Sequence, residues 1–186
     1  MLHRKLFYDA IRESLFGRKI LESQQEGIHV ILENWEATYP TSDLRWLAYA
    51  LGTTHHECME DGVATMQPIE ETGRGAGRWY DKPDPETGFV YYGRGFVQLT
   101  HKANYEKAGE KLGIDLVHEP ALALQPDIAA KILLRGMTEG WFTGARFDWY
   151  FNDKREDWIN ARRIVNALIR AELVAGYSKL YFDALT

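Results

Sequence analysis

A long glycine- and proline-rich stretch, residues 62–95, constrains the fold of this chain more than any other feature. Because glycine and proline punctuate regular elements, we expect a loop region there with at most a small hairpin. An irregular stretch of this length inside a compact domain is more often functional than a simple connection. The residues that interrupt regular structure are Gly73, Gly75, Gly77, Pro83, Pro85, Gly88, Gly93 and Gly95.

Apolar residues recur at helical spacing on both sides of this loop region. The sequence therefore predicts one mainly α-helical domain over residues 1–186, with the loop region lying across one side. Ser23 and Glu26 have the spacing of a capping box, which predicts the start of a helix. Further helices are expected from Thr41 or Ser42 to about Cys58, at residues 103–112, after Pro126, and without a break over residues 158–182.

The composition fits a globular protein with its own core, since 45% of the residues are apolar and 26% are charged. A formal net charge of −5 weighs against broad nucleic-acid binding, which depends on neutralising phosphates. One cysteine permits no internal disulfide, which suits a reducing cytoplasm.

The first sixteen residues carry polar side chains at helical intervals, unlike the unbroken apolar run of a signal peptide. No run in the chain approaches the length that spans a membrane. We therefore expect a protein held in the cytoplasm, without stable membrane association, that another factor must release if it acts outside.

The stretch TTHHEC, residues 53–58, places two histidines, a glutamate and the one cysteine at the end of an apolar helix. A metal is disfavoured, because adjacent His55 and His56 point about 100° apart on a helix and the HExxH spacing of zinc hydrolases is absent. Cys58 falls on the apolar stripe, where a free cysteine behaves as a small inert hydrophobe. Glu57 remains, either as a solvated glutamate at a helix end or as a general acid that burial beside Trp46 keeps protonated.

A second acidic pair, Glu70 and Glu71, follows in TMQPIEETG at the start of the loop region. Glycoside hydrolysis needs two carboxylates on opposite walls of a cleft, one to protonate the leaving oxygen and one to activate water or to attack. Solvation of a loop explains the pair equally well. The glycine pairs in GRGAG and YYGRG lack the Gly-Lys-Ser/Thr ending and the βαβ setting of a phosphate loop, so nucleotide binding is set aside.

The most specific motif is YYGRGFVQLT, residues 91–100, followed by Asn104 and Tyr105. It strongly resembles the signature of glycoside hydrolase family 19, the family of chitinases and phage endolysins. Three further segments also match the family and occur in its order along the chain: AYALGTTHHE, TMQPIEETG and INARRIVNA. The resemblance thus runs from about residue 5 to the end of the chain.

The resemblance implies a mainly α-helical, two-lobed, lysozyme-like fold with the substrate cleft between the lobes. It implies hydrolysis of β-1,4 links between N-acetylated amino sugars with inversion, for which the two carboxyl groups lie roughly 6.5–9.5 Å apart. By motif, Glu57 matches the general acid and Glu71 the general base, with Glu70 in reserve. The stretch between HHE and MQPI is longer than expected, which leaves Glu60 and Asp61 open as the second acid.

Five further positions match residues of the family's cleft. Gln98 and Thr100 line it, and the hydroxyl of Thr100 helps to hold the attacking water. Tyr92 and Asn104 match substrate contacts, and Asn166 matches an asparagine that faces the catalytic centre. Packing of Tyr92 and local capping by Asn104 or Asn166 are the alternatives. The resemblance implies neither a cofactor nor a metal.

Three hypotheses follow for the substrate. The first is a phage-type endolysin that cleaves the glycan strand of bacterial peptidoglycan and stays in the host cytoplasm until a holin opens the membrane. The second is a chitinase acting on chitin oligosaccharides, and the third is an inactive glycan-binding protein on the same scaffold. In each case we expect a monomer whose partner is a glycan and not a nucleic acid.

Overall fold

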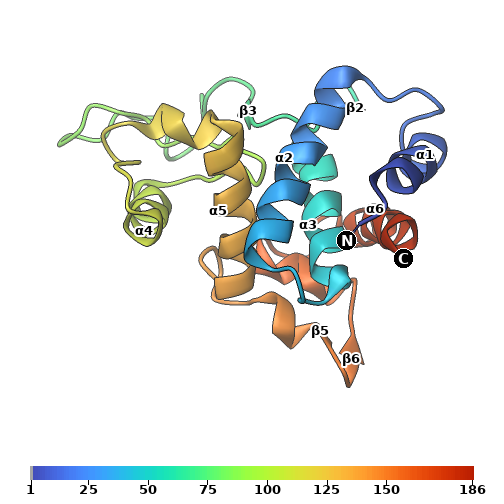
Figure 1. The fold of residues 1–186 in the computed structure, drawn as a ribbon. Coiled ribbons are helices and arrows are strands. Elements are labelled where there is room, and N and C mark those ends of the chain that lie inside the picture. The colour runs from blue at the N-terminus through green and yellow to red at the C-terminus, as the bar shows by residue number, and fades with distance from the viewer. Residues whose placement is uncertain (1) are drawn as a thin grey trace.

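The computed structural model describes residues 2–186, and one helix, α3, stands at the centre of the molecule (Figure 1). The elements are α1 (Arg4–Ser14), α2 (Glu22–Thr38), α3 (Leu44–Glu57), β1 (Met59–Glu60), β2 (Val63–Ala64), β3 (Ile69–Glu70), β4 (Arg94–Gly95), α4 (Lys102–Leu112), the 3₁₀ helix η1 (Pro120–Leu124), α5 (Pro126–Glu139), η2 (Phe147–Trp149), β5 (Phe151–Asn152), β6 (Arg155–Glu156), η3 (Asn160–Ile164) and α6 (Ala171–Leu185).

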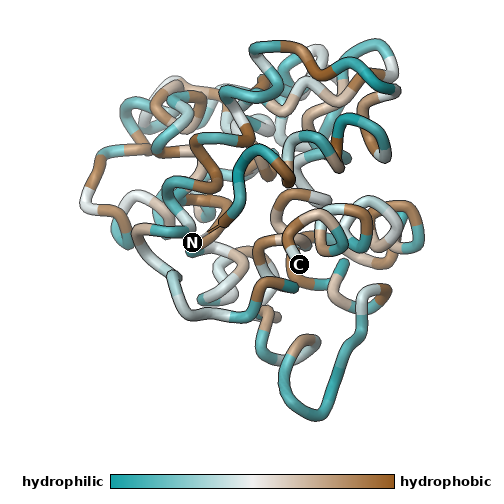
Figure 2. Tube along the Cα trace, turned by 45° about the vertical axis from the view of Figure 1, so that its right-hand side comes forward, coloured by the Kyte–Doolittle hydropathy of each residue, from teal (hydrophilic) through white to brown (hydrophobic). Residues whose placement is uncertain are grey.

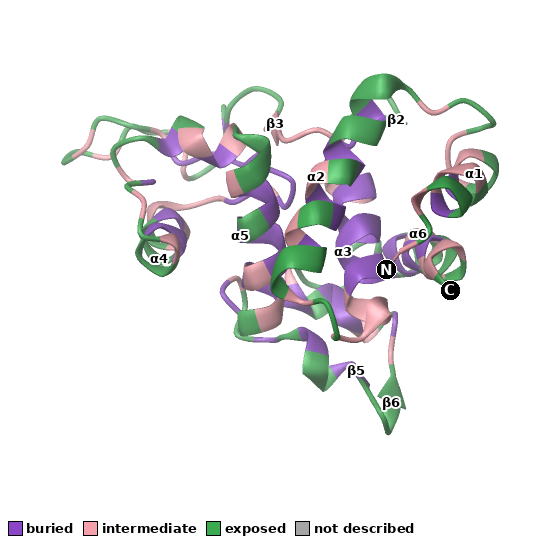
Figure 3. Ribbon diagram, viewed as in Figure 1, coloured by how far each residue is buried: buried purple, intermediate pink, exposed green. Residues whose placement is uncertain are grey.

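Helix α3 is buried on all sides over its middle turns, from Leu47 to His55 (Figure 3). It packs against α6 most extensively, and also against α5 and α2. The carboxylate of Asp43 caps its start by accepting the N–H of Arg45 at 2.9 Å, slightly later in the chain than expected. Glu57 is the last residue of this central helix, so the candidate acid follows directly on its fully buried turns.

Two groups of elements flank this centre. Helices α1 and α6 lie on one side, and α4 with η1 and the loop region lie on the other, with α2, α3 and α5 between them (Figure 1). The predicted mainly α-helical architecture is therefore found. The tube in Figure 2 alternates between apolar and polar residues along the helices, as expected when each helix buries one face. No helix within residues 2–186 has the length and apolarity needed to cross a membrane.

The loop region is organised by two short antiparallel strand pairs. Strands β1 and β2 form a hairpin in which Met59 pairs with Ala64. Strands β3 and β4 come from the two ends of the region, and Ile69 pairs with Gly95. This second pair closes the loop and brings the TMQPIEETG segment against the YYGRG motif. A third pair, β5 with β6, was not expected from the sequence.

The predicted capping box of the second helix is wrong. Helix α2 begins at Glu22, one residue before Ser23. The side chain of Gln24 accepts the backbone N–H of Leu21 at 2.8 Å, and its amide group donates to the carbonyl of Ala64 at 2.7 Å. A buried glutamine that also bonds to the loop region therefore replaces the Ser23–Glu26 pair.

The predicted unbroken helix over residues 158–182 is also wrong. The 3₁₀ helix η3 ends at Ile164, and α6 begins at Ala171 after Arg170, which has a left-handed φ of 60°. Leu168 lies in this break and is 40% exposed. The guanidinium of Arg162 stabilises the break by donating to the carbonyl of Ile169 at 3.1 Å.

Candidate functional site

A cleft of about 550 Å³ lies where the end of α3 meets the loop region and the C-terminal break. Its walls come from segments far apart in the sequence. The residues that line it are Glu57, Glu71, Arg78, Tyr80, Gly93, Val97, Gln98, Leu99, Thr100, His101, Asn104, Phe142, Val165 and Asn166. The fold thus places the predicted acid and base, Glu57 and Glu71, around one cavity. Four of the five other positions that matched the family's cleft also line this cavity.

Glu57 projects from the end of α3 with a side chain that is 17% exposed. Its Oε1 lies 2.7 Å from Nη2 of Arg162, whose side chain is 2% exposed. The contact is an ion pair with poor hydrogen-bond angles, since Oε1 meets no hydrogen-bond criterion. Within residues 2–186 no hydrogen bond reaches Oε2, so this oxygen is available to a substrate.

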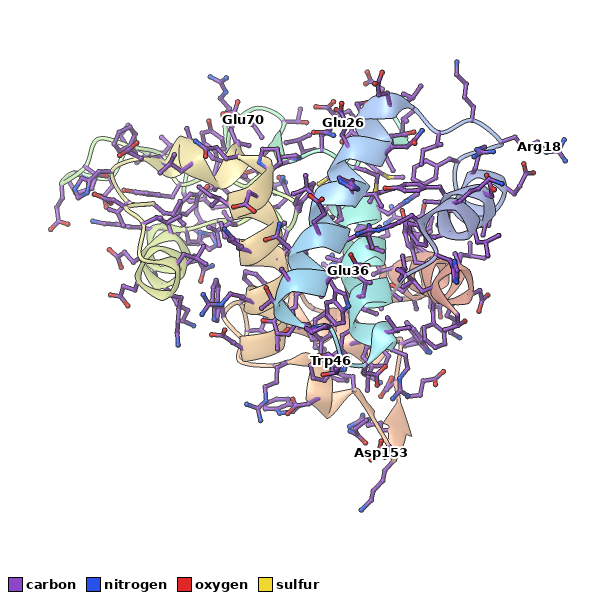
Figure 4. The ribbon with its side chains drawn as sticks, in the orientation of Figure 1. Arg18, Glu26, Glu36, Trp46, Glu70 and Asp153 are labelled. Atoms are coloured by element: carbon purple, nitrogen blue, oxygen red, sulfur yellow. The ribbon has the colours of Figure 1, made fainter. Side chains whose placement is uncertain are left out.

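The apolar setting expected for Glu57 is absent. Trp46 lies at the opposite end of α3, where its indole donates to the carbonyl of Phe151 at 3.2 Å and stacks on Phe147 (Figure 4). Eleven residues of helix separate the two side chains by about 16 Å. The angular argument that placed Trp46 beside Glu57 ignored this rise along the helix axis. A buried guanidinium is the neighbour instead.

Glu71 is held by two donors on the facing wall. The hydroxyl of Tyr80 donates to its Oε1 at 2.8 Å, and the backbone N–H of Gly93 donates to its Oε2 at 3.0 Å. Its own backbone N–H donates to the carbonyl of Gly93 at 2.7 Å. Side chain and backbone are therefore both tied to the YYGRG motif, and both carboxylate oxygens have fixed positions.

The motif brings Gln98 and Thr100 against Gly93. The amide of Gln98 donates to the carbonyls of Ile69 and Gly95 at 3.1 and 3.2 Å. A Cβ added at Gly93 would lie 2.7 Å from Oε1 of Gln98, so a residue with a side chain there would force the Gln98 amide to move. Thr100 donates its hydroxyl proton to the carbonyl of Gln98 at 2.7 Å, which leaves its oxygen as an acceptor in the cleft.

Asn104 and Asn166 reach the cleft from two different elements. Asn104 lies on α4 and donates its amide to the carbonyl of Thr100 at 2.7 Å. Asn166 lies in the break before α6 and accepts the N–H of Ala167 at 2.8 Å. The break that the sequence analysis missed is what turns Asn166 toward the cavity, because a continuous helix would not leave it in an open loop.

Glu70 and Tyr92 do not line the cleft. The hydroxyl of Tyr92 donates to Oε1 of Glu70 at 2.6 Å, and Nε of Arg74 donates to Oε2 at 2.9 Å. The hydrogen bond from Tyr92, followed by the charge of Arg74, holds the pKa of Glu70 below its ordinary value. Figure 4 shows Glu70 at the upper edge of the molecule in this view. Glu60 and Asp61, the other candidates for the second acid, are exposed residues outside the lining.

Tyr92 and Arg94 stabilise the motif through contacts on its buried side. The guanidinium of Arg94 is buried, lies 3.6 Å from the centre of the Tyr92 ring, and donates to the hydroxyl of Tyr105 at 2.9 Å. This hydroxyl in turn donates to the carbonyl of Tyr92 at 2.8 Å. The arginine of YYGRG therefore supports the loop from inside the protein and does not face the cleft.

The other members of TTHHEC lie on the core side of α3. Nδ1 of His55 is 3.1 Å from the hydroxyl of Tyr181, and burial lowers the pKa of His55 to about 4. Burial raises the pKa of the Cys58 thiol, which lies 3.5 Å from the carbonyl oxygen of Phe96. Burial also lowers the pKa of His56, beside Glu57. Over residues 2–186 no three His, Cys, Asp or Glu side chains gather in a way that would hold a metal ion.

Sequence reasoning missed three polar lining residues, Arg78, Tyr80 and His101, and also Arg162, which lies behind Glu57 and outside the lining. No pattern in the sequence distinguishes Arg162 from Arg163, because the two are adjacent and carry the same charge. Only the fold directs Arg162, and not Arg163, toward Glu57. His101 follows the motif directly and has a left-handed φ of 74°, a conformation that is costly for a residue with a side chain. Gln98, with a φ of 54°, shares this feature. Such strain is characteristic of functional loops, but the sequence does not reveal it.

Comparison with known proteins identifies the segment that carries these residues. Residues 68–143 match the family model described as chitinase class I, of glycoside hydrolase family 19. Chitinase 11 of Oryza sativa subsp. japonica is 55% identical over 40 residues, which are 22% of this chain and 16% of that protein. The acidic 27 kDa endochitinase of Solanum lycopersicum is 29% identical over 102 residues, 55% of this chain and 37% of that protein. The matches thus span well under half of these relatives' own lengths.

The solved structure of chitinase C from Streptomyces griseus HUT6037 aligns with 99% of this chain and 92% of its own, with a TM-score of 0.57 and 19% identity. This likeness concerns the fold, which is mainly α-helical, two-lobed and lysozyme-like. The segment that carries the motif, residues 68–143, belongs to glycoside hydrolase family 19, and the chain as a whole has the fold of a chitinase of known structure.

Proposed function

We propose that this chain is a glycosidase that hydrolyses β-1,4 links between N-acetylated amino sugars. The observation that carries the proposal is the placement of Glu57 and Glu71 in one cleft, on segments that belong to different walls. Chitin-type oligosaccharides are the first candidate substrate, because the relatives named above are chitinases.

The proposed reaction is a single displacement. Glu57, once protonated on Oε2, donates that proton to the glycosidic oxygen and returns to the ionised form that pairs with Arg162 through Oε1. Glu71 accepts a proton from a water molecule, whose oxygen attacks the anomeric carbon from the opposite face as the bond to the leaving sugar breaks. Tyr80 and Gly93 keep Glu71 directed at that water, and Thr100 accepts one of its hydrogen bonds. The anomeric configuration inverts.

The peptidoglycan glycan strand is the second candidate, and Arg78 favours it. Arg78 lines the cleft, and in the described part of the chain its guanidinium has no carboxylate partner. Peptidoglycan carries carboxylates on its peptide stems, whereas chitin carries none. An unpaired guanidinium in the wall would distinguish the two glycans by charge.

The test is hydrolysis of chitin oligosaccharides and of purified peptidoglycan, with the first-formed anomer read by NMR. We expect turnover with inversion, and we expect Glu57→Gln and Glu71→Gln each to lower kcat by about 100-fold or more, as loss of a general acid or base does. Glu60→Gln, an exposed acid outside the cleft, is the matched control and should leave kcat unchanged.

Tight binding of both glycans without turnover by the wild-type protein would refute the proposal and identify an inactive glycan-binding protein. Full activity of Glu57→Gln would equally refute the assigned acid. If only peptidoglycan is cleaved, the second substrate candidate replaces the first.

A further inference from the structure

Trp79 is the most exposed large hydrophobic side chain among the residues described, at 82%. Its indole stacks on the ring of His101, with centroids 4.7 Å apart and 25° between the planes. The edge of Tyr80 meets it at 5.6 Å and 84°. One face of the indole is therefore supported by the protein, and the other faces solvent.

The support beneath this indole is fixed. His101 lines the cleft, and its backbone N–H donates to the carbonyl of Tyr91 at 2.8 Å. Its left-handed φ of 74° is strained for a residue with a side chain and persists only because the surrounding structure imposes it. Because His101 is fixed, the indole that stacks on it also has a defined position.

Tyr80 links the indole to the proposed base. Its ring lies edge-on to both Trp79 and His101, and its hydroxyl reaches Glu71 at 2.8 Å. A single tyrosine ring thus separates the open indole face from the carboxylate. A glycan chain whose reacting unit lies at Glu71 would pass this face with a neighbouring unit.

We propose that Trp79, backed by His101, is a subsite for a pyranose ring of the glycan outside the reacting unit; this rests on the proposed function. A β-linked amino sugar presents an apolar face of C–H groups, and the negative face of an indole attracts such polarised hydrogens. The hydroxyl and N-acetyl groups project from the ring edge, where Arg78 offers five N–H donors. The ligand class is therefore a β-1,4-linked N-acetylated amino sugar, from chitin or from peptidoglycan.

The surroundings favour a sugar over a protein partner. Among residues 72–88, Trp79 is the one exposed side chain that is large and hydrophobic. The exposed residues near it in the sequence include Arg74, Arg78 and Lys82. A protein interface needs a contiguous patch of several hundred Å². A single ring flanked by polar groups matches the size and the amphipathic character of one sugar unit.

The experiment compares Trp79→Ala with Trp149→Ala. Trp149 is also an exposed tryptophan, at 51%, but it lies on η2 and outside the cleft lining, which makes it a matched control. For long chitin oligosaccharides and for peptidoglycan strands, we expect Trp79→Ala to raise KM about tenfold with kcat unchanged. For the shortest cleaved oligosaccharide we expect no change, because that ligand does not reach the indole. Trp79→Phe should retain part of the affinity.

A binding measurement separates this proposal from the proposed function. Affinity for the longest chitin oligosaccharide and for a soluble peptidoglycan strand is measured by calorimetry in the Glu57→Gln background, where no turnover is needed. Weaker binding by Trp79→Ala, with Trp149→Ala unchanged, supports the subsite even if the wild type cleaves neither glycan. Equal affinities of the three proteins for both glycans overturn it. The glycan that loses affinity identifies the source of the ring, and equal melting temperatures confirm that the variants are folded.

Discussion

Two tyrosine–glutamate pairs stand beside each other in the loop region, and only one of them faces the cleft. Tyr80 donates to Glu71 in the cavity, whereas Tyr92 donates to Glu70 outside it. The chemistry of the two contacts is the same, and the two acids are consecutive in the sequence. Glu70 is the last residue of β3 and Glu71 follows it with its backbone still bonded to Gly93, so the two consecutive side chains point to opposite sides of this extended segment.

This pairing gives a direct test of which acid is the base. Tyr80→Phe removes a donor to the carboxylate that we assign, so we expect kcat to fall about tenfold with KM unchanged, in line with the loss of one hydrogen bond to a charged group.

Tyr92→Phe is the matched control, because it removes the same contact from Glu70. We expect it to leave kcat unchanged, although it loosens the packing of the motif. The opposite result, in which Tyr92→Phe alone lowers kcat, would assign the base to Glu70.

At the level of elements, glycines decide how closely helices approach each other. A Cβ added at Gly52 on α3 would lie 2.1 Å from Oγ of Ser178 and within 3 Å of the backbone of α6. Gly176 on α6 meets nothing within 4 Å. The first glycine sets the contact between α3 and α6, and the second only weakens its helix.

Opposite stability changes are therefore expected from the same substitution at these two positions. Gly52→Ala should lower the free energy of unfolding by about 3 kcal/mol, the upper range for overpacking. Gly176→Ala should raise it by about 1 kcal/mol, because alanine is the better helix former. Urea unfolding of both variants measures this, and a neutral Gly52→Ala would mean that α6 can move away without cost.

Elements with local signals could be predicted, and those built by distant pairing could not. Pro126 predicted the first turn of α5 because its fixed φ suits that position, and the helix begins there. The pairing of β3 with β4 joins residues that are far apart in the chain, so no local pattern indicates it. The break before α6 escaped because its apolar residues keep a helical spacing, although Leu168 is exposed.

The same division applies to the cleft. Its carboxylates could be named from motifs, since Glu57 and Glu71 follow recognisable strings. Their surroundings could not, because Arg162 and Tyr80 reach them only through the fold. The direction of a side chain along a helix also matters: Trp46 and Glu57 share an angular sector but lie three turns apart.

For the molecule as a whole, His55 links stability to pH. It is 4% exposed and packs between Phe16, Tyr177 and Tyr181, and burial lowers its pKa from 6.5 to about 4. The unfolded chain therefore binds this proton more readily than the folded one between these two values. The contribution of neutral His55 to the free energy of unfolding is complete above pH 6.5. It is lost as the pH falls toward 4, by about 3 kcal/mol in total.

Unfolding free energies at pH 7 and pH 4 should show this loss in the wild type. His55→Gln should show a smaller loss, because it removes the group that titrates. His29→Gln, at a histidine whose side chain is 53% exposed, should keep the full wild-type loss. An unchanged pH dependence in His55→Gln would contradict the assignment.

The guanidinium of Arg162 makes two contacts: it pairs with Glu57, and it donates to the carbonyl of Ile169 in the break before α6. Arg163 has the same chemistry one position later, but its side chain is exposed and its contact is a 3.4 Å hydrogen bond to Asn160. Mutation supplies changes at both positions at equal rates, and selection should retain them unequally. Among descendants of this chain, position 163 is free to drift, whereas a change at 162 would have to be answered both at the end of α3 and in the turn before α6.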